Sequence, residues 1–236
     1  MQFFYRTIAA LSSCGIANIW KADTARANAV DRRSFPVMPD GRSDIVIVFD
    51  SATLQTVTAM HTGFDRSATA VHLPEEAVFV GVQCTPASNR GAREIASSDR
   101  LLATFVPWVR SLLGPVPAAI PSGLGRVLRA GFDPLVEHVD AGLRRTPSRD
   151  HIAALAQSAD ASLRTVERRF LACSGLRPSD MVRIYRFVKF SRLGAASDRL
   201  SDTAYRLGYA DQAHMCREVK RLSGMTPEQF RRRVSA

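Results

Sequence analysis

The sequence lacks features that define several large classes of protein. Only four of its 236 residues are cysteine, at positions 14, 84, 173 and 216, and no two form a Cys-x-x-Cys pair. Scattered cysteines in a chain of this length do not indicate a disulfide framework, so we expect free thiols in a reducing cytoplasm. No apolar run approaches the roughly 20 residues that a membrane helix needs. Leu11-Ser12-Ser13-Cys14 loosely resembles a lipoprotein cleavage box, but the apolar stretch before it is too short for export.

The usual groupings of catalytic residues are also missing. The sequence has no phosphate-binding glycine loop, no His-Glu-x-x-His pair and no recognisable Ser/His/Asp arrangement. His61 and His72 stand alone, without the His-x-His group and following Glu of a metal-binding cupin barrel. We therefore expect no enzyme activity, no metal and no cofactor.

Lysine is scarce, with only Lys21, Lys189 and Lys220, so arginine supplies most of the positive charge. The net charge of +10 is unevenly distributed: residues 151–236 contain 16 Lys+Arg and 8 Asp+Glu, whereas residues 1–150 contain 16 and 14. A basic domain concentrates near a polyanion, and arginine suits bidentate contacts to phosphate and guanine. Nucleic acid is the favoured partner of the last third, with an acidic membrane surface or simple solubility as the alternative.

The first 98 residues or so have the pattern of short strands. Asp44-Ile-Val-Ile-Val-Phe-Asp50 is a continuous apolar run, and residues 53–60 and 78–83 are further candidates. Short strands with frequent turns favour a small barrel or sandwich. The apolar spacing then becomes helical, which predicts helices over about 99–113 and 122–141, with Pro107 and Pro134 as a kink or interruption.

A short, polar, Pro-containing segment at residues 142–149 is the expected interdomain linker. We therefore predict an α+β protein with a domain at residues 1–141 and an all-helical domain at residues 150–236. No helix of either domain is expected to cross a membrane.

Two similar helix pairs are expected in the second domain. In the first, about 152–173, Leu155 and Ala156 belong to a short helix, Asp160 occupies the turn, and Ser162 caps the next helix. In the second, about 200–223, Gly208 occupies the turn and Asp211 caps the following helix. A long helix from residue 178 to about 193 separates the pairs.

The pattern of the second domain resembles the DNA-binding domain of the AraC/XylS family of bacterial transcription regulators. The resemblance covers about 85 residues and rests on three motifs: Ser162-x-Arg164-x-Val166-x-Arg168-x-Phe170, Gly175-x-x-Pro178 and Gly208-Tyr209-x-Asp211-Gln212-Ala213-His214. It departs from the family at Met181, Thr203, Met215 and Val219, which are mostly core positions. Some DNA-alkylation repair proteins share this tail, but they need a Pro-Cys-His-Arg acceptor, whereas Cys84 is followed by Thr-Pro.

The resemblance implies two recognition helices that contact adjacent major-groove segments of promoter DNA. The candidate DNA-binding residues are Ser162, Arg164, Glu167, Arg168, Gln212, Ala213, Cys216 and Arg217. Arg suits guanine, Glu cytosine, Gln adenine, and Ala or Cys a thymine methyl. Three alternatives stay open: some arginines contact only phosphate, Glu167 pairs with a neighbouring Arg, and Cys216 is a redox sensor whose pKa a basic neighbourhood lowers. His214 is expected to form a structural hydrogen bond.

For the first domain, the resemblance implies a cupin-like domain that senses a ligand or mediates dimerisation. The helix over 99–113 is expected either to form a homodimer interface or to cover the barrel. The resemblance further implies a cytoplasmic activator that works with RNA polymerase and responds to a small-molecule effector. Control by a protein partner, and repression in place of activation, are the alternatives.

Overall fold

A computed structural model describes residues 5–9, 15–24, 35–114, 119–193 and 199–235. Cys14 lies outside these ranges, as does the rest of the lipoprotein-like segment. The strands are β1 (Tyr5–Ala9), β2 (Ile16–Asp23), β3 (Phe35–Val37), β4 (Ser43–Asp50), β5 (Thr56–Thr62), β6 (Thr69–Val71) and β7 (Ala77–Cys84). The strand pattern of the sequence is therefore confirmed for β4, β5 and β7.

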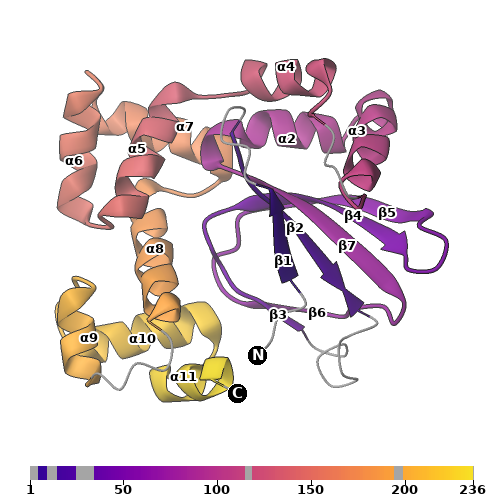
Figure 1. The fold of residues 1–236 in the computed structure, drawn as a ribbon. Helices are drawn as coiled ribbons and strands as arrows, with labels where there is room; N and C mark the ends of the chain where they lie inside the picture. Colours follow the sequence, from indigo (N-terminus) through magenta and orange to yellow (C-terminus); the bar gives the residue numbers. More distant parts are fainter. Residues whose placement is uncertain (1–4, 10–14, 25–34, 115–118, 194–198, 236) are drawn as a thin grey trace.

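Five strands form an open antiparallel sheet in the order β1-β2-β7-β4-β5, and β3 pairs with β6 in a separate two-stranded sheet. The α+β class is confirmed, but the described strands do not close into a barrel. The physical reason is visible in Figure 1: helices α2 (Asn89–Ala96) and α3 (Asp99–Ser111) lie across one face of the sheet, and α4 (Ser122–Ala130) packs on α2. These helices bury the apolar face that a closed barrel would turn inward.

The core of this half forms between the sheet and these helices. Ile45, Ile47 and Val80 of the central strands pack with Phe105 and Val109 of α3, and all five are at most 1% exposed. Of the two roles predicted for the helix over 99–113, α3 therefore covers the sheet. Pro107 lies inside α3, which nevertheless continues to Ser111.

The remaining helices form the second half of the molecule. They are α5 (Pro134–Arg145), α6 (Arg149–Ser158), α7 (Leu163–Ser174), α8 (Pro178–Arg192), α9 (Leu200–Arg206), α10 (Gln212–Ser223) and α11 (Pro227–Ser235). The interruption expected at Pro134 is real: α4 ends before it, Pro134 is the first residue of α5, and Asp133 caps that helix by accepting from the Leu135 and Val136 amides. The proposed linker segment, 142–149, contains the end of α5 and the start of α6.

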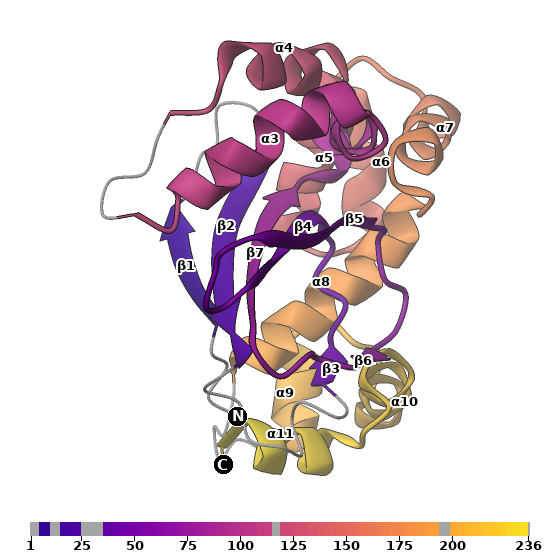
Figure 2. The same cartoon turned by 90° about the vertical axis from the view of Figure 1, so that its right-hand side faces the viewer.

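Helix α5 packs with the helices that follow it. Val136, Val139 and Leu143 of α5 are fully buried in the same core as Phe170 of α7 and Phe187 of α8. Helix α8 then runs away from this group to α9, α10 and α11, as Figure 2 shows. The long helix thus separates two smaller helical groups while sharing a core with both.

Two loops of the sheet half pack against the helical half. The loop between β3 and β4 brings Gly41 onto α8, where a Cβ on this residue would lie 2.7 Å from Cε1 of Tyr185. Gly41 also has a φ of +77°, which favours glycine. Beside it, the buried carboxylate of Asp140 accepts from the Tyr185 hydroxyl and pairs with Arg42 at 3.6 Å. The second loop, between β5 and β6, places Phe64 against the helical core.

Candidate nucleic-acid interface

The first helix pair consists of α6 and α7 joined by a short turn. Asp160 in this turn has a φ of +49°, so the prediction that Asp takes the left-handed position is confirmed. The Ser162 side chain accepts from the Thr165 amide at 3.1 Å and so caps α7. Val166 and Phe170 are 0% exposed, which fixes the inner face of α7 against the core and leaves the opposite face outward.

The second helix pair consists of α9 and α10. Gly208 in the turn has a φ of +72°, and the Asp211 carboxylate accepts from the His214 amide at 2.6 Å, which confirms both predictions for this turn. Met215 and Val219 of α10 are 0% exposed, so these departures from the family pattern still fill the core. Helix α10 therefore resembles α7 in two respects: a side chain caps its start, and one stripe of its surface is buried.

The outward faces of α7 and α10 carry the side chains that the sequence singled out. Cys216 is half-buried. The other seven are exposed: Ser162, Arg164, Glu167, Arg168, Gln212, Ala213 and Arg217. The residues lie in the first two turns of each helix or, for Ser162, at its cap. Exposed side chains at the start of a helix can enter the major groove, because a duplex groove accepts a helix in this orientation.

Two side chains on α10 have surroundings that bear on the alternatives raised above. The pKa of the Cys216 thiol is raised, first by burial and then by the charge of Glu228, while Arg217 lowers it less. Burial and Glu228 thus outweigh the basic neighbour, so the direction of this pKa does not support the redox alternative. The His214 ring packs edge-to-face on Tyr209 in the turn, with 5.4 Å between ring centroids.

Contacts from the sheet half reach the far ends of both outward helices. At the end of α7, Asn89 Nδ2 donates to the Cys173 carbonyl at 2.6 Å, and Arg66 Nη2 donates to the Gly175 carbonyl at 2.8 Å. At the end of α10, the Ala68 amide donates to the Leu222 carbonyl at 2.6 Å. The loop from β5 to β6 therefore bridges the two helix pairs.

Sequence reasoning missed these bridging residues. Asn89 is 4% exposed and its Oδ1 also accepts from the Ser43 hydroxyl at 2.7 Å and lies 2.9 Å from Nε2 of His61. A buried Asn with three partners holds several segments together, but a single Asn at the start of a helix carries no periodic signal in the sequence. Only Arg66, as a lone cation between strands, could have been noted from the sequence.

A family model described as a helix-turn-helix domain matches residues 155–233. Among curated proteins, the HTH-type transcriptional regulator VirS of Mycobacterium tuberculosis is 39% identical over 79 residues, for strain H37Rv and for strain CDC 1551 alike. The match covers 33% of this chain and 23% of VirS, so this chain spans about a quarter of that relative's length. Within the described residues, no helix is long and apolar enough to cross a membrane.

Two solved structures show a low similarity to this chain. ToxT from Vibrio cholerae O395 aligns over 99% of each chain with 10% identity and a TM-score of 0.45. CdpR from Pseudomonas aeruginosa aligns over 69% of this chain and 47% of its own, with 17% identity and a TM-score of 0.39. The helix pairs, their caps and the matched segment agree: residues 155–233 are similar to a helix-turn-helix domain, in line with the AraC/XylS resemblance of the sequence.

Proposed function

We propose that this chain is a sequence-specific transcription regulator that contacts two adjacent major-groove segments through α7 and α10. The observation that carries the proposal is the repeated geometry of these two helices. Each begins at a side-chain cap, buries one stripe in the core and exposes polar residues in its first two turns. Two such helices held by the long helix α8 suit successive turns on one face of a duplex.

Within this function, the positively charged contacts to bases or phosphates come from Arg164, Arg168 and Arg217. Gln212 suits adenine, and Glu167 can accept from the exocyclic amine of cytosine. Ala213 and Cys216 present small apolar surfaces to a thymine methyl, and Ser162 completes the set at the start of α7. The helix starts also direct unpaired backbone N–H groups at phosphates.

The sheet half is the proposed control element. Its loop between β5 and β6 donates hydrogen bonds to the ends of both recognition helices, through Arg66 and the Ala68 amide. A small effector or a partner protein that moves this loop changes the relative placement of α7 and α10, and with it the affinity for DNA. On family grounds the outcome is activation together with RNA polymerase. The unit that contacts DNA is proposed to begin at α5, because this helix shares the core of α7 and α8.

The test uses Arg217→Ala on DNA sites selected from a randomised pool by the full chain. Loss of a bidentate arginine–guanine contact costs about 1–3 kcal/mol, or roughly 5- to 150-fold in affinity, and relaxes the preference at one base pair. Arg126→Ala is the matched control, because Arg126 is an exposed arginine on α4. If Arg217→Ala selects the same sites with the same affinity as Arg126→Ala, α10 does not contact bases as proposed.

A further inference from the structure

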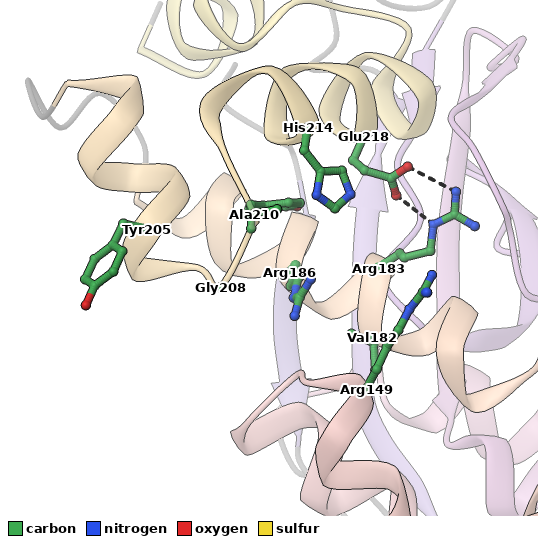
Figure 3. Close-up of a pocket in the computed structure, with 10 residues that line it drawn as sticks. Arg149, Val182, Arg183, Arg186, Tyr205, Gly208, Ala210, His214 and Glu218 are labelled. Atoms are coloured by element: carbon green, nitrogen blue, oxygen red, sulfur yellow. Dashed lines mark hydrogen bonds and ion pairs between the residues drawn. The ribbon is translucent and has the colours of Figure 1, made fainter.

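A cavity of about 620 Å³ lies between the two helix pairs. Arg149 enters it from the start of α6, Arg183 and Arg186 from α8, and Glu218 from α10, as Figure 3 shows. The turn before α10 completes the wall with Tyr209. Because its walls come from both helix pairs, anything bound in this cavity contacts both pairs at once.

Positive charge in the cavity exceeds the negative charge available to it. The carboxylate of Glu218 is taken by Arg183, whose Nε and Nη2 donate to it at 2.6 and 3.1 Å. Neither Arg149 nor Arg186 has a carboxylate oxygen within 4.0 Å in the described part of the chain. Neither guanidinium group therefore forms an ion pair in this cavity, and the carboxylates of Glu218 and Asp150 act on Arg186 only from a longer distance.

The two arginines are close enough to influence each other. Arg186 is partly fixed, since its Nε donates to the Pro147 carbonyl at 2.9 Å and its guanidinium lies 5.5 Å from the centroid of the Tyr209 ring. Burial lowers the pKa of Arg186 most, and the charge of Arg149 also lowers it, whereas Tyr209, Glu218 and Asp150 raise it. An anion placed between the two guanidinium groups removes this repulsion.

Tyr209 adds an unused donor to the same cavity. The residue is 7% exposed, and its buried hydroxyl has no hydrogen-bond partner among the residues described. The hydroxyl is near enough to Arg186, Glu218 and Arg183 for their charges to shift its pKa, and burial raises that pKa most, so it stays protonated. A buried hydroxyl without a partner is destabilising, and an anion that accepts from it removes this cost.

We propose that this cavity binds a phosphate group, which accepts from Arg149, Arg186 and the Tyr209 hydroxyl while Arg183 stays paired with Glu218. Arginine is suited to this ligand because its planar N–H groups match two phosphate oxygens. The cavity is larger than one phosphate, so it has room for the rest of a phosphorylated small molecule. The same group can come from a free metabolite or from the DNA backbone between the two recognition helices.

The first experiment titrates the full chain, without DNA, with inorganic phosphate and then with pyrophosphate at constant ionic strength. Isothermal titration calorimetry is expected to show one saturable site per chain, weakened at least about tenfold by Arg149→Gln, since a charge-assisted pair is lost. Tyr209→Phe is expected to weaken binding several-fold without lowering the melting temperature, because the hydroxyl it removes has no partner in the free protein. Arg126→Gln, on α4, is the control and is expected to bind as the wild type does.

The second experiment distinguishes the source of the phosphate, and only this arm depends on the function proposed above. If the DNA backbone is the source, free phosphate does not bind, and Arg149→Gln reduces the slope of log affinity against log salt by about one without changing base preference. The inference is overturned if neither phosphate nor pyrophosphate binds and neither Arg149→Gln nor Tyr209→Phe changes DNA affinity. Failure of the proposed function is separate, since it shows as unchanged site selection by Arg217→Ala.

Discussion

Replacing Asn89 with alanine is expected to lower the free energy of unfolding by about 3 kcal/mol. The side chain is 4% exposed and joins Ser43 and His61 of the sheet half to the end of α7. Its removal leaves the fully buried Ser43 hydroxyl and the Cys173 carbonyl without their partner. Each buried group left unpaired costs about 1–3 kcal/mol, and entry of one water into the vacated space offsets part of the sum.

The assay is urea unfolding followed by two probes. Trp20 and Trp108, the only tryptophans, both lie in the sheet half, whereas far-UV circular dichroism reports mainly the helices. Because Asn89 joins the halves, its loss is expected to separate the two transitions, which coincide in the wild type. Ser43→Ala removes only one of the three contacts and is expected to cost about 1 kcal/mol.

Gln55→Ala serves as the control, because the side chain of Gln55 is exposed in the turn between β4 and β5. We expect it to cost less than about 1 kcal/mol and to leave the two probes coincident. If Asn89→Ala matches Gln55→Ala within about 0.5 kcal/mol, or if its transitions stay coincident, Asn89 does not couple the halves as the geometry indicates.

Three further substitutions test other parts of the structure. Burial raises the pKa of Asp44 to about 7, well above its unfolded value of 3.8, so the stability of the protein falls as pH rises through this interval. Asp44→Asn is therefore expected to stabilise the protein at pH 8 by at most about 4 kcal/mol, and not at pH 4, as measured by urea unfolding midpoints. Equal midpoint differences at the two pH values would contradict this. Phe170→Ala, at a 0% exposed position, is expected to cost about 4 kcal/mol and to abolish DNA binding in gel shifts, whereas the half-exposed Leu171→Ala is expected to do neither. Gly41→Ala is expected to lower the stability by about 2 kcal/mol in thermal melts, because Gly41 has a positive φ and lies in close contact with α8. Gly63→Ala is the control, since a Cβ on Gly63 meets nothing within 4 Å. Equal losses of stability in the two variants would show that the contact of Gly41 with α8 does not matter.

Much of the helical half could be predicted because its signals are local. A cap needs one side chain within three residues, as Ser162 and Asp211 show, and a left-handed turn needs one tolerant residue, as Asp160 and Gly208 show. The buried stripe of α10 follows from a spacing that one helix turn imposes. Local rules therefore predicted the positions of α7 and α10 and of their outward faces.

The sheet half shows where local rules end. The apolar run of β4 predicted a buried strand, but the same run suits a barrel, a sandwich or an open sheet. One face of β4 is buried by helices that follow about 40 to 80 residues later in the chain, whereas its other face packs with Trp20 and Phe79 of neighbouring strands. An open sheet formed because α2, α3 and α4 cover one face, and no short window of sequence contains that fact.

What the sequence by itself determined is the pair of capped helices α7 and α10, because caps, turns and helical stripes depend on residues a few positions apart. What only the tertiary structure decided is how those helices are held and what lies between them. Asn89 meets the end of α7 across 84 positions of sequence, and the cavity gathers Arg149, Arg186 and Tyr209 from three separate elements. Such contacts arise from packing of distant segments, which leaves no periodic trace in the order of the residues.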